Sequence, residues 1–281
     1  MKKIIFQKLK IKENFISKKY FSSLSKFKNN TICFAQKITQ NDIKKINNLN
    51  SGIIILNKKN KLIKNKFLQI IHSNPKIYFF KLLNENIKKN PTIYIKPRIK
   101  KSATIDKSVF IGSNSSVGDN TKICANVVIG NNVTIGKNCF IKSNTVIGQR
   151  GFGNLVLKGK IFPITHIGGV KIGNDVEIGA LNTIAQATLD YTIIKSNNKF
   201  DDHVHVAHNC IIDENNEFTA GVILAGSVKI GKNNFFGINS TVENGITIGN
   251  NNIVGSSTNV RKNILSNKLI YGNPAKVIKK N

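Results

Sequence analysis

The sequence predicts a mainly β protein, in which a three-sided parallel β-helix follows a small N-terminal α/β domain. Three observations lead to this prediction. Apolar residues recur at every sixth position after residue 90, asparagines stand three residues after many of them, and the first 90 residues lack this repeat. A period of six fits neither an α-helical turn nor simple strand alternation, so each unit must hold a short strand and a corner.

The repeat extends through residues 91–265. Its first run has no exception: Ile93, Ile99, Ile105, Ile111, Val117, Ile123, Ile129, Ile135, Ile141 and Ile147. This six-residue frame of apolar positions is interrupted by an insertion at residues 149–169 and returns at Ile172. After Ile184 it slips by four residues, which are additional to the usual six, and it then continues from Ile194 to Val260. If each of these residues points inward on one flat side and three sides make a coil, about eight coils stack as parallel strands.

The corners of such a coil need residues that can turn sharply. Asparagine tolerates positive φ better than other non-glycine residues, and it stands three places after the inward position at Asn114, Asn120, Asn126, Asn132, Asn138 and Asn144. Glycine directly follows the inward residue where a side chain would crowd the bend, at Gly112, Gly118, Gly130 and Gly136. A β-sandwich would show less regular spacing than this.

Residues 1–90 are expected to form the small α/β domain, and residues 266–281 a C-terminal tail. The apolar run 52–56 predicts a strand. The segment that begins with Asn74 and Pro75 predicts a helix with one apolar face, because Asn caps and Pro tolerates the first helical turn. No glycine-rich dinucleotide motif occurs in this part of the chain.

The composition favours a globular protein with a basic surface. Among 281 residues, 40% are hydrophobic and the formal net charge is +29, but the lysines are spread along the chain and no nucleic-acid recognition motif accompanies them. Acidic partners, such as a nucleotide diphosphate or an acidic carrier protein, fit this charge. The four cysteines lack CxxC pairing, and no run is long enough to cross a bilayer, so a cytoplasmic protein with reduced thiols is expected.

The segment FDDHVHVAHNC, residues 200–210, holds three of the five histidines and could suggest a metal site. Val204 and Val206 should face inward, which turns His203 and His205 outward and places His208 beyond the corner. Three imidazoles arranged in this way do not converge on one ion, so no metal is expected and His203 and His205 are predicted to be surface residues.

Strings such as VVIGNNVTIGKN and VKIGNDVEIGALNTI resemble the hexapeptide-repeat acyltransferases. That resemblance implies a left-handed β-helix and a homotrimer with active sites between subunits. The N-terminal segment NPKIYFFKLL, the loop GQRGFG and the motif AHN together resemble the UDP-3-O-acylglucosamine N-acyltransferases of lipid A biosynthesis. The resemblance implies transfer of a 3-hydroxyacyl group from acyl carrier protein to the 2-amine of a UDP-linked sugar, with no tightly bound cofactor.

The same resemblance assigns the site residues. His208 would be the general base, since a sugar amine that attacks a thioester must lose a proton and a neutral imidazole can accept it. Gly226 would offer a backbone N–H to the tetrahedral oxyanion. The substrate-binding residues would be Gln149, Phe152 and Asp201, together with Phe34, whose ring would stack on uracil or else pack in the core.

Several positions depart from that family's pattern. Lys37 and Gln40 stand where the polar and tyrosine partners of the uridine site are expected, and Gly245 replaces a second histidine. The ending LIYGNPAKVIKK resembles acetyl-CoA-dependent sugar transferases. Arg261 and Lys262 could bind either acyl donor, so an acetyl-CoA-dependent N-acetyltransferase is an alternative, and an inactive β-helix scaffold is a second one.

Overall fold

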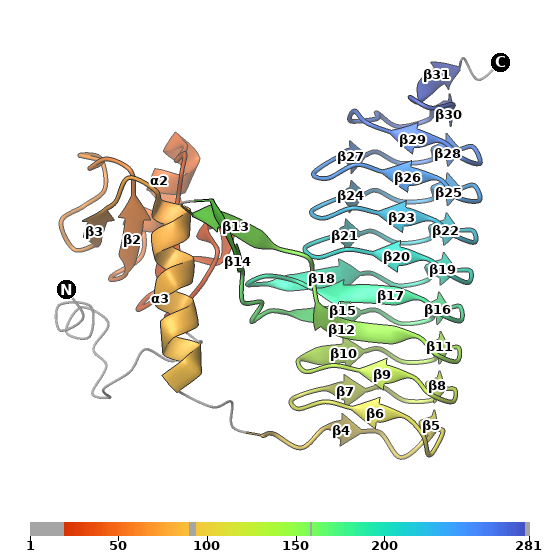
Figure 1. The fold of residues 1–281 in the computed structure, drawn as a ribbon. Helices are drawn as coiled ribbons and strands as arrows, with labels where there is room; N and C mark the ends of the chain where they lie inside the picture. Colours follow the sequence, from red (N-terminus) through yellow and green to blue (C-terminus); the bar gives the residue numbers. More distant parts are fainter. Residues whose placement is uncertain (1–19, 90–93, 158, 279–281) are drawn as a thin grey trace. The chain divides into compact units, whose positions relative to one another are not determined.

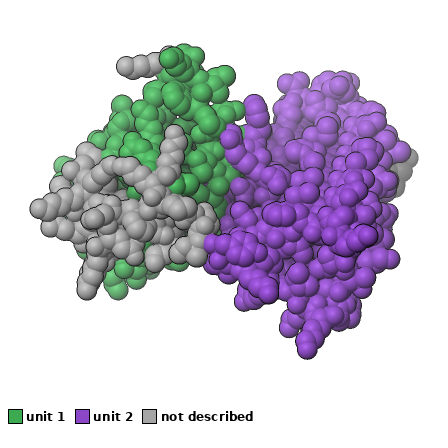
Figure 2. All heavy atoms as spheres, turned by 60° about the horizontal axis from the view of Figure 1, so that its bottom comes forward, with its two compact units in different colours: residues 1–93, 153–167 green, residues 94–152, 168–281 purple. Residues whose placement is uncertain are grey.

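The computed structural model describes residues 20–89, 94–157 and 159–278. Contacts divide the chain into two compact units: residues 1–93 with 153–167, and residues 94–152 with 168–281 (Figure 2). The inserted loop, expected as part of the β-helix domain, therefore belongs mostly to the first unit. Ile93, the first residue of the predicted frame, lies outside the described residues.

The second unit is a parallel β-helix whose coils stack one on another (Figure 1). Its first face contains β4 (Arg98–Ile99), β7 (Ser116–Val117), β10 (Val133–Ile135), β15 (Gly169–Ile172), β18 (Tyr191–Ile194), β21 (Ile211–Ile212), β24 (Lys229–Ile230) and β27 (Thr247–Ile248). The second face contains β5 (Thr104–Ile105), β8 (Lys122–Ile123), β11 (Phe140–Ile141), β16 (Glu177–Ile178), β19 (Lys199–Phe200), β22 (Glu217–Phe218), β25 (Phe235–Phe236), β28 (Ile253–Val254), β30 (Leu269–Tyr271) and β31 (Lys276–Ile278). The third face contains β6 (Phe110–Ile111), β9 (Val128–Ile129), β12 (Val146–Arg150), β17 (Thr183–Gln186), β20 (His205–Val206), β23 (Ile223–Leu224), β26 (Thr241–Val242) and β29 (Asn259–Val260).

The predicted frame is the core of this unit. From Val117 to Val260 its members are buried, and Ile105 and Ile111 in the first coil are partly buried. Ile99, which was also expected to point inward, is exposed at this end of the β-helix. Between coils, Phe218 stacks on Phe200 with ring centroids 4.6 Å apart and on Phe236 at 4.8 Å. The predicted left-handed β-helix is confirmed. Its expected end at residue 265 is too early, because β30 continues the second face by pairing with β28.

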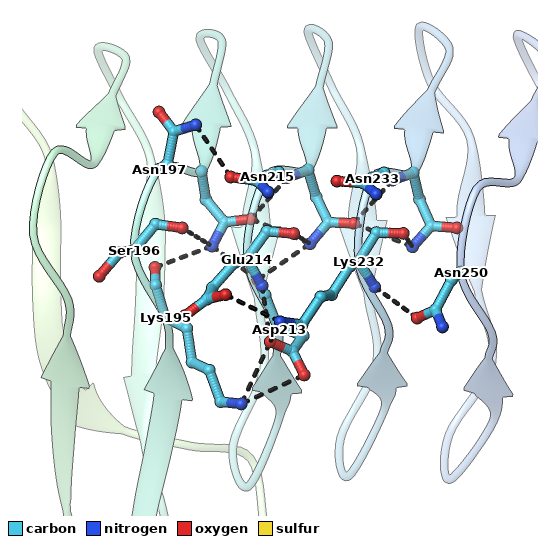
Figure 3. A network of polar contacts seen from close by, with 12 residues as sticks. Lys195, Ser196, Asn197, Asp213, Glu214, Asn215, Lys232, Asn233 and Asn250 are labelled. Atoms are coloured by element: carbon cyan, nitrogen blue, oxygen red, sulfur yellow. Dashed lines mark hydrogen bonds and ion pairs between the residues drawn. The ribbon is translucent and has the colours of Figure 1, made fainter.

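The corners also follow the sequence. All six predicted corner asparagines, from Asn114 to Asn144, have positive φ. The glycines serve a different purpose from the one expected: a Cβ on Gly118 would meet the backbone of Gly136 in the next coil, so close approach between coils requires glycine there. Hydrogen-bonded side chains also link successive coils, among them Asn197 to Asn215 and Lys195 to Asp213 (Figure 3).

A column of asparagines lies inside one corner. Asn198, Asn216, Asn234 and Asn252 are buried, and each Nδ2 from Asn216 onward donates to the Oδ1 of the preceding member at 2.9 to 3.0 Å. These amides are therefore satisfied despite complete burial. The spacing of 18 residues between coils thus also holds for polar side chains inside the β-helix.

The first unit contains a parallel sheet of β1 (Ile32–Phe34), β2 (Ile53–Leu56) and β3 (Leu68–Ile71). Its helical segments are η2 (Leu24–Lys26), α2 (Gln40–Asn47) and α3 (Pro75–Lys89), and the inserted loop adds the hairpin β13 (Asn154–Leu157) and β14 (Lys160–Pro163). The predicted strand and the helix that begins at Pro75 are both present. No helix in the described ranges is long and apolar enough to span a bilayer.

Candidate active site

The site lies at the corner where the third face of the β-helix turns into the first. Strands of successive coils pair here so that each residue lies beside the residue 18 positions later, as His205 lies beside Ile223. Backbone hydrogen bonds continue the register beyond the strands, from Ser227 N–H to His208 O and from Gly245 N–H to Gly226 O. His208, Gly226 and Asn244 therefore follow one another in successive coils, which lie about 4.8 Å apart.

A cavity of about 640 Å³ opens at this corner within the second unit. Much of its wall is aliphatic, from Val146, Ile184, Ala185, Ala207, Ile223 and Ala225. The polar groups are Gln149, Arg150, Thr183, His205, His208 and Asn244, and Gly151, Phe152 and Gly226 complete the lining. An apolar wall with a few convergent polar groups is typical of a small-molecule site.

His208 lies between two glycines that leave no room for side chains. A Cβ on Gly226 would lie 2.7 Å from Cε1 and 3.0 Å from Nε2 of the imidazole. A Cβ on Gly151, in the loop after β12, would lie 2.7 Å from Cβ of His208. The Cε1–Nε2 edge of the ring thus faces the Gly226 backbone, whose N–H makes no hydrogen bond to another described residue.

The other edge of the imidazole meets Asn209. Its Nδ2 lies 2.9 Å from Nδ1 of His208, and its Oδ1 accepts a hydrogen bond from the Thr188 N–H at 2.9 Å. Thr188 belongs to the four-residue slip of the repeat between β17 and β18. Sequence reasoning did not identify Asn209, because corner asparagines recur throughout the chain.

His205 points outward from the third face, as predicted. It is half-buried, lines the cavity, and its Nδ1 lies 2.6 Å from Thr183 Oγ1. Burial, followed by the charge of nearby His208, lowers the pKa of His205. His203 is exposed, at a corner with φ 61°. No group of three metal-ligating side chains that could hold an ion occurs in the part of the chain described.

Gln149 and Phe152 both line the cavity, and the Phe152 side chain is 89% exposed. Asp201 is exposed at the corner after β19 and is not among the described residues lining the cavity. Phe34 lies in the first unit, half-buried on β1, with its ring 5.0 Å from that of Phe79 and 5.8 Å from that of Phe80. The structure therefore brings together two of the four predicted substrate contacts.

The residues expected near the acyl donor lie in the last coils. Arg261 forms an ion pair with Glu243 at 2.9 Å, and Lys262 is exposed. Gly245 has φ +76°, a conformation that a histidine adopts with strain. Asn244, which precedes it and lines the cavity, was not identified from the sequence.

Cys210 is the only thiol within two residues of His208, but it faces the core. Its Sγ lies 3.2 Å from Ala225 O, and burial raises its pKa to about 12. A thiol held protonated in this way is a poor nucleophile. A cysteine–histidine pair is therefore not the reactive group of this cavity.

The lowered pKa of His205 predicts a pH-dependent stability. The unfolded chain takes up a proton at this residue more readily than the folded chain, so folding loses stability as the pH falls below about 6.5. The His205→Gln variant lacks this proton. Thermal unfolding between about pH 7.5 and 5 should therefore show a steeper fall of the midpoint for the wild type than for the variant. Parallel curves would contradict the prediction.

Comparisons with protein families match the repeat. The family described as bacterial transferase hexapeptide (six repeats) matches residues 114–149, and hexapeptide repeat of succinyl-transferase matches residues 227–256. Curated relatives named UDP-3-O-acylglucosamine N-acyltransferase include those of Hahella chejuensis, 48% identical over 64 residues, and Chlorobium chlorochromatii, 53% identical over 68 residues. These matches cover 23% and 24% of this chain, but only 18% and 19% of the relatives.

Solved structures extend the likeness to about two thirds of the chain. LpxA from Acinetobacter baumannii superposes with a TM-score of 0.55 and 28% identity, over 65% of this chain and 71% of that one. The UDP-N-acetylglucosamine acyltransferase of Francisella novicida gives a TM-score of 0.56 and 26% identity, over 66% and 69%. The chain thus carries bacterial transferase hexapeptide repeats folded as a left-handed parallel β-helix, and over 64 to 68 residues it is similar to UDP-3-O-acylglucosamine N-acyltransferases.

Proposed function

We propose that this chain is an N-acyltransferase of lipid A biosynthesis that transfers a 3-hydroxyacyl group from acyl carrier protein to the 2-amine of UDP-3-O-acyl-glucosamine. One observation carries the proposal: His208 lies in an apolar cavity with its Cε1–Nε2 edge against the Gly226 backbone. The names of the curated relatives and of the solved neighbours supply the reaction class and the UDP-linked acceptor.

The proposed reaction joins an amine to a thioester. The amine nitrogen attacks the thioester carbon, the C–N bond forms, and the carbonyl electron pair moves to oxygen. His208 takes the proton that the nitrogen loses, the C–S bond breaks, and the thiolate leaves and is protonated to a thiol. The Gly226 N–H, which has no partner among the described residues, would donate to the oxyanion.

The acceptor would lie between residues 149–152 and the third face, within the second unit. Gln149 offers an amide to sugar hydroxyls, and the exposed Phe152 ring offers an apolar face to the sugar. Asp201 is proposed as a further sugar contact outside the cavity wall. Phe34 is proposed to contact uracil, although its packing on Phe79 also suits a core aromatic.

The donor would follow the corner of the β-helix. Asn244 lies two coils beyond His208, and Lys262 follows in the next coil, so a thioester arm could run over roughly 14 Å along this column. Arg261 and Lys262 would meet the phosphate at its far end. Acyl carrier protein and CoA both carry such a phosphate, and the acetyl-CoA-like C-terminal sequence keeps acetyl-CoA as the alternative donor.

The third face of the β-helix is proposed as the subunit interface of a homotrimer. The residues directly before its inward positions carry no fixed charge although the chain has a net charge of +29; they are Phe110, Val128, Val146, Thr183, His205, Ile223, Thr241 and Asn259. The charged Arg150 ends β12, and Glu243 and Arg261 directly follow β26 and β29. The first face, in contrast, exposes Arg98, Lys171 and Lys229. A surface with few fixed charges is what a second copy of a strongly basic chain could cover at little electrostatic cost.

Replacement of the proposed base tests the activity. His208→Ala should lower kcat by roughly 100- to 10,000-fold, because the proton of the attacking amine loses its acceptor. Turnover of UDP-3-O-acyl-glucosamine is measured by product formation, and light scattering checks that the assembly is unchanged. His203→Ala, at an exposed corner outside the cavity, is the control. A His208→Ala variant as active as His203→Ala would contradict the proposal, and a wild type without turnover would favour an inactive scaffold.

A donor competition distinguishes the two acyl sources. The wild type is incubated with UDP-3-O-acyl-glucosamine and either 3-hydroxyacyl carrier protein or acetyl-CoA. Turnover is expected with the carrier protein, and Arg261→Glu should raise its KM because the phosphate loses a cation. Turnover with acetyl-CoA alone would overturn the proposed donor.

A pair of threonine variants tests the interface. Thr241→Lys places a charge on the third face, where it would be buried in each of three subunits, so dissociation to monomers is expected. Thr247→Lys makes the same change on the first face and should leave the trimer intact. Size-exclusion chromatography with light scattering measures both. Identical masses for the two variants would argue against this interface.

A further inference from the structure

We propose that Arg150 binds the diphosphate of the acceptor, and so selects a sugar amine that is linked to a nucleotide over one that is not. This role rests on the proposed function, because it concerns the acceptor of that reaction. It can nevertheless be tested by the binding of a nucleotide alone, without any transfer of an acyl group.

Arg150 carries the one fixed charge among the described residues that line the cavity of His208. No carboxylate is present among them, and their other polar side chains are two amides, a hydroxyl and two imidazoles. Arg150 is exposed, and its guanidinium makes no hydrogen bond or ion pair with another described residue. Arg261, in contrast, is paired with Glu243 at 2.9 Å. The donors of Arg150 are therefore available to an anionic ligand.

The backbone of β12 holds Arg150 close to His208. Gly148, with φ +86°, is an extra residue at the point where the pairing of β12 with β17 shifts. A bulge of this kind redirects the side chains that follow it and is common next to active sites. Arg150 precedes Gly151, on which a Cβ would lie 2.7 Å from Cβ of His208. Since neighbouring Cα atoms are about 3.8 Å apart, the arginine begins within reach of a ligand that touches the imidazole.

The chemistry of the proposed acceptor places an anion next to the reacting amine. In a nucleotide-linked 2-amino sugar the amine is attached to C2, and the diphosphate is attached through oxygen to the adjacent C1. An amine that meets His208 therefore brings the first phosphate to the same cavity. A guanidinium donates two parallel hydrogen bonds to phosphate oxygens, and a cavity wall without carboxylates offers it no competing partner.

The acyl donor also carries a phosphate, but that phosphate lies at the other end of a long arm. In a phosphopantetheine thioester the sulfur and the phosphate are the two ends of the arm, so a thioester carbon near His208 leaves its phosphate far from the imidazole. Only Gly151 separates Arg150 from the contact with His208. The diphosphate of the acceptor is therefore the anion that this arginine is placed to meet.

Nucleotide binding by the resting protein tests this role. UDP and uridine differ only in the diphosphate, so the ratio of their Kd values, measured by calorimetry, reports what the anion contributes. The wild type should bind UDP at least about tenfold more tightly than uridine, and Arg150→Gln should lose most of this preference while its affinity for uridine is unchanged. A preference that survives in Arg150→Gln, or a wild type that has none, would overturn the proposal.

A second arginine provides the matched control. Arg98→Gln removes the same charge from an exposed position on the first face, away from the described cavity lining, and should keep the preference for UDP. Arg150→Lys keeps the charge but not the planar fork of donors, so its preference should be intermediate. Equal losses in Arg98→Gln and Arg150→Gln would assign the effect to the net charge of the chain and overturn a local site.

Kinetics separate the acceptor from the donor. Arg150→Gln should raise the KM of the acceptor roughly tenfold, change kcat much less, and leave the KM of the donor unchanged. A rise in the donor KM alone would overturn the proposal. So would dissociation of the assembly seen by light scattering, since Arg150 would then pair with a carboxylate of a second copy. A wild type that binds UDP through Arg150 but shows no turnover would contradict the proposed reaction and support the diphosphate site.

Discussion

The register of 18 residues between coils is the constraint on which the rest of this structure depends. Once inward residues such as Val206 and Leu224 stack on a face, each residue beside them has a fixed neighbour one coil away. Corner residues follow the same rule, since the backbone of Ser227 bonds that of His208. Side chains far apart in sequence are thereby aligned in columns, and the column of His208, Gly226 and Asn244 forms one side of the cavity.

A perfectly regular β-helix has flat faces and no cavity, so the site depends on the two places where the repeat fails. The insertion after β12 places Gly151 against His208 and brings Gln149 and Phe152 to the opening. The four-residue slip after β17 places Thr188 against Asn209. Both irregularities occur at the corner that carries His208, which links departure from the repeat with function.

Charged side chains also pair according to the stacking of the coils. Pairs such as Lys195 with Asp213 and Lys232 with Glu214 link neighbouring coils on exposed positions, where each contributes little to stability. The cavity wall is instead mostly aliphatic, and burial there lowers the pKa of His205. A site with few fixed charges suits a reaction in which protons move between neutral groups.

The sequence by itself determined the β-helix, because a period of six with corner asparagines specifies the inward face and the turns locally, residue by residue. It also predicted a site with His208, Gly226, Gln149 and Phe152, whose motifs are short and contiguous, and these four residues line one cavity. Only the tertiary structure placed His205 in the cavity and Asn209 beside His208, and placed Phe34 against Phe79. Those contacts depend on an insertion and a slip that bring distant residues together, and periodicity carries no information about where irregular segments pack.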